Sequence, residues 1–285
     1  MLDAAVVSLA LDPERSQVAA LGAEPWLFDG AGWKPIPLPG SLHAKAGERD
    51  DARIYFGRDH QPRIMGNRLD AGGLTQLYLR FRRGAWHDEP KELASFAGKP
   101  RAAIYGVLGW DDPEVLCKVG EQCLVKQRSG WSQVPLPVPG PATALRIDLG
   151  LGATYALLPR RLLRLGKGGW VAVGGEGPWQ GTPGGAWLDR AGGWVSGPEE
   201  DALYRHDGKT WSRHASPVHE PRGLWASTEQ ELWIAGRDGV GYYDGERFRR
   251  VEGIAGPVAE IVGRADRLWF GGAGGVWMVR LPPGN

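Results

Sequence analysis

Short apolar runs recur along this chain, and most of them end in a turn that leads into an aromatic residue. Typical copies are PWLFDGAGW at 25–33 and ALYRHDGKTW at 202–211. The aromatic residues that follow the turns are Trp33, Trp86, Trp131, Trp170, Trp211 and Phe248. Their spacing is roughly forty residues, the period of β-propeller blades that hold several strands each. A seventh copy, GVWMVR at 275–280, comes near the end of the sequence without a following aromatic residue.

The pattern inside each repeat indicates four antiparallel strands. ELWIAG at 231–236 and RLWFGG at 267–272 are continuously apolar, as expected for strands that neighbouring sheets cover on both faces. RFRRV at 247–251 alternates, as expected for a half-exposed outer strand. The sequence therefore predicts an all-β, seven-bladed β-propeller of four-stranded antiparallel blades. A β-sandwich, the other all-β candidate, does not repeat a strand pattern at this period.

The seventh repeat offers residues for three strands only. After Arg280 the printed sequence has five residues, two of which are proline and cannot donate ladder hydrogen bonds. We therefore expect the last blade to be three-stranded, with its outer edge at 275–280. An unpaired edge is a candidate for pairing with a strand of another chain.

Composition and charge narrow the class of protein. The 285 residues include 44 Gly, 22 Pro and 14 Trp, which suits many short turns and broad interfaces between sheets, and we expect a single domain over 1–285. The net charge of +1 argues against a nucleic-acid partner. Without an apolar run of about 20 residues, membrane insertion is not expected. The start has no basic segment or cleavage site, so the chain is expected to be cytoplasmic as printed, or periplasmic or extracellular if a leader was removed.

The last three repeats carry a family resemblance. ELWIAGRDGVGYYDGERFRRV and RLWFGGAGGVWMVR resemble LWxGTxxGLxxYDG, the propeller repeat of sensor regions in bacterial two-component regulators. The threonine of that repeat is missing from both copies. The match covers 221–280 well and 182–220 loosely. It implies the propeller fold rather than an activity. Such propellers are similar in shape to lyase and lactonase propellers, which bind a metal in a central channel.

Signatures of catalysis are missing from the sequence. Gly166-Lys167 continues with glycine instead of the Ser or Thr of a phosphate loop, and His219-Glu220 continues with Pro221 rather than as a zinc-protease motif. We therefore assign no catalytic residue, metal ligand or cofactor. Cys117 and Cys123 flank a predicted hairpin loop and face each other, so they are either a disulfide or two reduced thiols.

Loops near the predicted channel mouth hold the candidate binding residues. Trp179 stands in a loop of glycines and prolines with no strand pattern to bury it, as for an exposed interface aromatic; the alternative is that it folds back to plug the channel. Loops at the same predicted face supply His43, Asp51, His219, Glu220, Arg222, Arg237 and Asp238. Their mixed charge suits another protein or a small ligand. We expect a non-catalytic interaction or ligand-sensing module. The alternatives are a metal-dependent lyase-like or lactonase-like enzyme and a carbohydrate-binding propeller.

Overall fold

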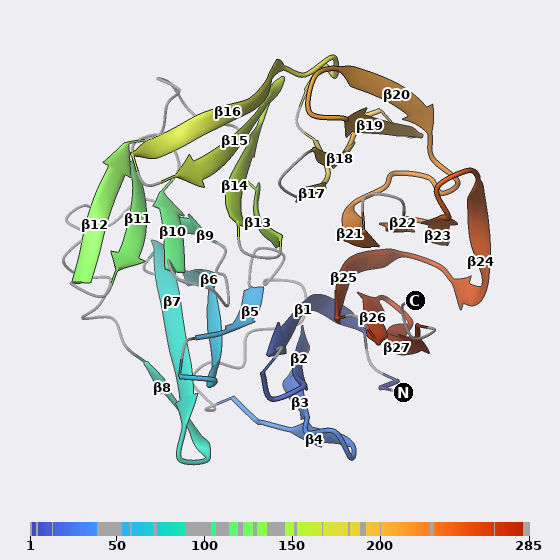
Figure 1. Ribbon diagram of the computed structural model, residues 1–285. Helices are drawn as coiled ribbons and strands as arrows, with labels where there is room; N and C mark the ends of the chain where they lie inside the picture. Colours follow the sequence, from blue (N-terminus) through green and yellow to red (C-terminus); the bar gives the residue numbers. More distant parts are fainter. Residues whose placement is uncertain are drawn as a thin grey trace. The chain divides into compact units, whose positions relative to one another are not determined.

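The computed structural model is built from strands joined by turns, and no helix occurs among the residues it describes (Figure 1). It describes residues 2–38, 53–88, 104–106, 114–118, 122–127, 130–135, 146–150 and 153–281, apart from 4, 13, 58, 71–72, 167, 182, 189–191, 200, 229–230 and 265. For 65–78, 88, 104–154, 156 and 227–228 the description covers the backbone alone. Two compact units are formed, one by 6–143 and the other by 144–285 together with 1–5.

The unit of residues 6–143 contains three described sheets of four strands each. Its strands are β1 (Val6–Asp12), β2 (Gln17–Gly22), β3 (Pro25–Phe28), β4 (Trp33–Pro35), β5 (Arg53–Phe56), β6 (Pro62–Asp70), β7 (Gly73–Arg82), β8 (Ala85–Asp88), β9 (Ile104–Gly106), β10 (Glu114–Lys118), β11 (Gln122–Gln127) and β12 (Gly130–Pro135). Each sheet is an antiparallel meander, in which strands that follow one another in the sequence lie side by side (Figure 1).

The second unit contains three described sheets of four strands and one of three. Its strands are β13 (Arg146–Gly150), β14 (Ala153–Leu158), β15 (Arg161–Gly166), β16 (Gly169–Glu176), β17 (Ala186–Leu188), β18 (Gly193–Ser196), β19 (Ala202–His206), β20 (Trp211–Ala215), β21 (Gly223–Thr228), β22 (Glu231–Gly236), β23 (Gly239–Tyr243), β24 (Phe248–Ala255), β25 (Val258–Arg264), β26 (Arg267–Gly272) and β27 (Gly275–Arg280). The predicted series of seven antiparallel blades, the last with three strands, is confirmed.

The outer edge of the last sheet is covered at one point. Leu2 forms an isolated antiparallel bridge with Val276 of β27, and the two residues exchange main-chain hydrogen bonds of 3.4 and 2.9 Å. A complete fourth strand is not formed by the described residues of this sheet. The bridge was not expected from the sequence, because the opening residues carry no strand pattern. Pairing of the remaining edge with another chain stays a prediction.

The turns between the third and fourth strands repeat the same hydrogen bonds. Asp29, Asp207 and Asp244 each accept bonds from the backbone N–H groups two and three residues ahead, at 2.8–3.1 Å. The residue after each aspartate is a glycine with φ between 93° and 96°, a conformation that side chains disfavour. Each Asp-Gly pair therefore has a structural role: the aspartate holds the turn by hydrogen bonds, and the glycine allows its backbone conformation.

The aromatic residues after these turns occupy equivalent positions. Each one pairs in register with a residue at or next to the end of the third strand: Phe28 with Trp33, Phe81 with Trp86, Lys126 with Trp131, Leu165 with Trp170, His206 with Trp211, and Tyr243 with Phe248. The equivalence predicted from the repeat is thereby confirmed at the level of the backbone.

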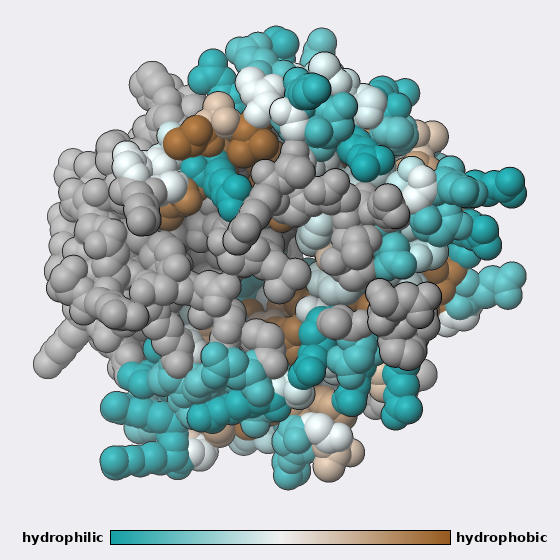
Figure 2. Space-filling view, viewed as in Figure 1, coloured by the Kyte–Doolittle hydropathy of each residue, from teal (hydrophilic) through white to brown (hydrophobic). Residues whose placement is uncertain are grey.

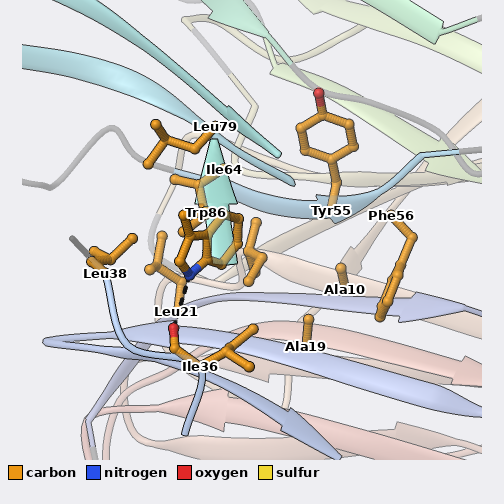
Figure 3. Packing of buried hydrophobic residues seen from close by; sticks show 11 residues of the cluster. Ala10, Ala19, Leu21, Ile36, Leu38, Tyr55, Phe56, Ile64, Leu79 and Trp86 are labelled. Atoms are coloured by element: carbon orange, nitrogen blue, oxygen red, sulfur yellow. Dashed lines mark hydrogen bonds between the residues drawn. The ribbon is translucent and has the colours of Figure 1, made fainter. Parts of the chain in front are cut away.

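Apolar side chains fill the space between successive sheets within each unit. One core joins the first two sheets, with Leu21 and Ile36 packed against Phe56, Ile64 and Trp86 (Figure 3). Three further cores join the four sheets of the second unit in the same way.

Two of the aromatic residues after the turns also bind the preceding sheet by a hydrogen bond. The indole Nε1 of Trp86 donates to the carbonyl oxygen of Ile36 at 2.8 Å (Figure 3). The indole Nε1 of Trp211 donates to the carbonyl oxygen of Gly174 at 3.1 Å. Both acceptors lie on or next to the outer strand of the preceding sheet, so each ring joins two sheets.

Replacing Asp29 with alanine tests the turn contacts through their pH dependence. A hydrogen bond from the Lys34 side chain, with those from the Ala31 and Gly32 N–H groups, lowers the pKa of Asp29 from 3.8 to about 2. A carboxyl whose pKa is lower in the folded state stabilises above its unfolded pKa, and this contribution is lost as the pH falls through the folded pKa. We therefore expect Asp29→Ala to unfold at a lower temperature than the wild type at neutral pH.

The difference between the two proteins should shrink as the pH falls below about 4 and vanish below about 2. Circular dichroism across this pH range measures it, with the exposed Glu252→Ala as the control. A difference that persists unchanged at the acid end would show that Asp29 does not act as a carboxylate.

Candidate functional site

Five of the loop residues predicted from the sequence lie together at one end of two neighbouring sheets. His219, Glu220 and Arg222 belong to the connection between β20 and β21, and Arg237 and Asp238 form the turn between β22 and β23. The two segments are joined through the backbone, because the N–H of Arg237 donates to the carbonyl oxygen of His219 at 2.8 Å. These five residues are called the polar rim below.

Glu220 is the centre of the polar rim. Its Oε1 accepts from Nη1 of Arg237 at 2.9 Å, and its Oε2 accepts from Nη2 of Arg222 at 2.8 Å. The hydrogen bond from Arg237, followed by that from Arg222, lowers the pKa of Glu220. Its backbone has φ 45°, in the left-handed region that a non-glycine residue adopts only when its surroundings hold it there.

Asp238 joins the same two segments through a second set of hydrogen bonds. Its Oδ1 accepts from the backbone N–H of His219 at 2.9 Å, and Oδ2 lies 2.8 Å from the Nη2 of Arg250. Burial raises the pKa of Asp238, but the bonds from His219 and Arg250 outweigh it, so the net shift is downward. Gly236 permits the close approach, since a Cβ at this position would lie 2.5 Å from the carbonyl oxygen of His219.

A third loop joins the rim through Asp201, in the connection between β18 and β19. The Nδ1 of His219 lies 2.7 Å from Oδ1 of Asp201. The carbonyl oxygen of Asp201 also accepts from the N–H of Ser216, at 2.8 Å. Three loops from two sheets are thus held in a defined arrangement.

The two arginines present most of their charge to solvent. The side chains of Arg222 and Arg237 are 54% and 69% exposed. Ion pairs this exposed contribute little to stability, so their positions do not follow from a need to hold the fold together. A guanidinium has five N–H donors, and each of these contacts Glu220 through one nitrogen. The remaining donors can bind a carboxylate or carbonyl oxygen of a partner.

The prediction that Trp179 is an exposed binding residue is wrong. The side chain is fully buried, with an exposed fraction of 0%. Its ring lies edge-on to Trp211 at 5.0 Å and is tilted against Tyr204 at 5.6 Å. It belongs to the core between the sheet of β13–β16 and the sheet of β17–β20.

The small neighbours of Trp179 explain the error. A Cβ on Gly177 would lie 2.1 Å from the indole ring, so only glycine lets the ring turn back at this point. The backbone N–H of Gly177 also donates to the carbonyl oxygen of Arg160 at 2.8 Å, which holds the loop against the sheet. Glycines and prolines around a tryptophan predict an exposed loop, whereas here the glycine makes room for a buried ring.

Three other predictions remain outside the described structure in whole or in part. His43 and Asp51 lie outside the described residues. For Cys117 and Cys123 the backbone is described, and the predicted register is confirmed because the two residues pair directly across β10 and β11. Disulfide and paired reduced thiols both remain open as predictions.

Arg250 is a rim contact that the sequence did not reveal. It lies on the outer strand β24, where the sequence pattern predicts that an arginine faces solvent. The pairing of β23 with β24 is irregular between Gly239 and Gly241, and Arg250 pairs with Gly241. Arg250 Nη2 also donates to the carbonyl oxygen of Asp238. No sequence signal marked this irregularity.

A metal site is not apparent in the part of the chain that the structure describes. There, no group of three or more His, Cys, Asp or Glu residues is arranged to hold an ion. The same residues contain no helix with the length and apolar character needed to span a membrane.

Comparison with known proteins bears on the fold. No protein-family model matches the sequence, and comparison with curated proteins gives no match. Virginiamycin B lyase from Staphylococcus aureus is similar in structure, with a TM-score of 0.67 and 13% identity over 97% of this chain and 94% of that one. YCF48 bound to a D1 peptide has a TM-score of 0.67 and 14% identity over 99% of this chain and 94% of its own.

Bacterial sensor proteins are also among the similar structures. The extracellular domain of BT4673, a candidate one component system from B. thetaiotaomicron, gives a TM-score of 0.64 and 13% identity over 98% of this chain and 39% of that one. The resemblance of the last repeats to propellers of such regulators is supported by this likeness. At these identities the comparisons establish a β-propeller fold. Because an enzyme and a peptide complex both appear, the fold alone does not decide the function.

Replacing Trp179 with alanine tests its place in the core. Loss of a fully buried indole is expected to lower the free energy of unfolding by about 3–5 kcal/mol. Denaturant unfolding followed by circular dichroism measures this, with the exposed Met278→Ala as a control that should change stability little. Unchanged stability of Trp179→Ala would contradict the buried position.

Proposed function

We propose that residues 1–285 form one non-catalytic β-propeller domain, which binds a segment of another protein through the polar rim. The observation that carries this proposal is the arrangement of Arg222 and Arg237 around Glu220. Two exposed guanidinium groups are held by one carboxylate in a strained backbone position, in a part of the molecule where their ion pairs add little stability.

The chemistry of the rim favours a peptide with acidic or carbonyl groups. Arginine is enriched in protein interfaces, and its planar group binds carboxylates through two parallel hydrogen bonds. The balance of charge within the rim argues against a polyanion. Arg222, Arg237 and Arg250 are set against Glu220, Asp238 and Asp201, which leaves no concentrated basic surface.

Rigidity of the rim lowers the entropic cost of binding. Backbone hydrogen bonds join the loops at Arg237–His219 and Ser216–Asp201, and Asp238 accepts from a backbone N–H. A partner therefore meets side chains that are already in place, which favours affinity. The structure of YCF48 bound to a D1 peptide gives a precedent for peptide binding on a similar fold.

A selection from a displayed library of random peptides tests the proposal. We expect the enriched peptides to carry Asp, Glu or a free carboxyl end, and their binding to weaken as salt is raised. For one enriched peptide made synthetically, Arg237→Ala and Arg222→Ala should each weaken binding about tenfold, the effect of losing one interfacial arginine.

The control is Arg249→Ala. Arg249 is similarly exposed and lies on β24, the outer strand of the sheet that supplies Arg237. It pairs at 2.8 Å with Asp244, in the turn between β23 and β24 at the end of this sheet opposite to the rim. It should leave peptide binding unchanged. The proposal fails if no peptide is enriched, or if the enriched peptides bind Arg237→Ala and Arg222→Ala as well as they bind the wild type.

A further inference from the structure

A cavity of about 460 Å³ lies between the sheet of β13–β16 and the sheet of β17–β20. The cavity reaches Gly208, in the turn between β19 and β20. The polar rim uses the connections before β19 and after β20, so the cavity and the rim lie at opposite ends of the sheet of β17–β20. Its lining includes Arg164, Val171, Val173, Gly174, Leu188 and His206. Its volume is within the range of small-molecule sites.

Glycines keep this cavity open. The core between the two sheets includes Val173 and Leu188, which also line the cavity, while other lining positions are glycines without a side chain to continue the packing. Gly174 is required for a second reason, since a Cβ there would lie 2.4 Å from Nε2 of His206. The opening has an apolar border, because Val171 is 62% exposed and Figure 2 shows apolar surface over β15 and β16.

The lining of the cavity includes one buried histidine, His206. His206 is only 5% exposed, and its ring packs against Trp211 at 4.8 Å. Its Nδ1 accepts a hydrogen bond from the backbone N–H of Gly208 at 3.3 Å, which leaves Nε2 as the donor of the ring. Nε2 has no hydrogen-bond partner among the described residues.

A positively charged side chain also lines the cavity. Arg164 of β15 is half-buried and lies opposite Val171 in the pairing of β15 with β16. Within the described chain, no carboxylate is placed to form an ion pair with it. The neighbouring arginines differ, since Arg160 and Arg161 both pair with Glu176, at 3.3 and 3.4 Å.

We propose that this cavity binds a small organic anion, a carboxylate carried on an apolar body. Arg164 supplies the positive charge, and Val171, Val173 and Leu188 supply the apolar walls. The site is separate from the polar rim, and it does not rest on the function proposed there.

Calorimetric titration with hexanoate and benzoate, and with the neutral hexanamide and benzamide, tests the proposal. We expect one carboxylate per chain to bind, with each amide about tenfold weaker or more, because a charged hydrogen bond is lost. Arg164→Gln should remove the preference for the carboxylate. Val171→Trp, placed at the exposed border, should block both kinds of probe.

The matched control is Arg161→Gln on the same strand, which should bind the carboxylates as the wild type does. Thermal unfolding of every variant separates a loss of fold from a loss of site, and Arg237→Ala at the rim should keep full carboxylate binding. The proposal is overturned if the folded wild type binds neither carboxylate when the carboxylate concentration reaches about 10 mM, which is high enough to detect millimolar affinity. It is equally overturned if folded Arg164→Gln and Val171→Trp bind them unchanged.

Discussion

Apolar packing between successive sheets is the interaction on which the other features of each unit depend. Within the sheet of β17–β20, Leu188 and Tyr204 belong to the core shared with the preceding sheet, whereas Trp194 and Leu203 belong to the core shared with the following one. Both faces of the inner strands are therefore buried, which is why these strands lack the alternation of polar and apolar residues that one-sided sheets show. A sheet of this composition is stable only between neighbours.

Because apolar side chains fill the space between the sheets, polar groups gather at the two ends of the sheets. At one end, hydrogen bonds between loops hold Glu220 and its two arginines in a fixed arrangement. At the other end, glycines interrupt the packing and leave a cavity between two sheets, bordered by His206 and Arg164. The two ends thus differ in character: one presents exposed charge on a rigid rim, and the other offers a half-buried cation in apolar surroundings.

Much of the fold could be predicted from the sequence because its signals are local. Asp-Gly turns followed by an aromatic residue marked the hairpins, and the register of Cys117 with Cys123 followed from the length of one loop. Features that depend on residues distant in the sequence were missed. The bridge of Leu2 with Val276, the burial of Trp179 and the contact of Arg250 with Asp238 arise from packing or irregular pairing that no local pattern encodes. The rim loops were predicted because the strand order places their ends together, but their hydrogen bonds were not.

A double-mutant cycle on Trp194 and Phe248 tests the central claim most directly. These residues belong to two successive sheets, and their rings meet edge to face at 6.0 Å. Free energies of unfolding for Trp194→Ala, Phe248→Ala and the double variant give the coupling between the two sheets. We expect a favourable coupling of about 0.5–1.5 kcal/mol, as for other aromatic pairs. Strict additivity of the two substitutions would contradict the account, because it would mean that the sheets do not stabilise each other through this contact.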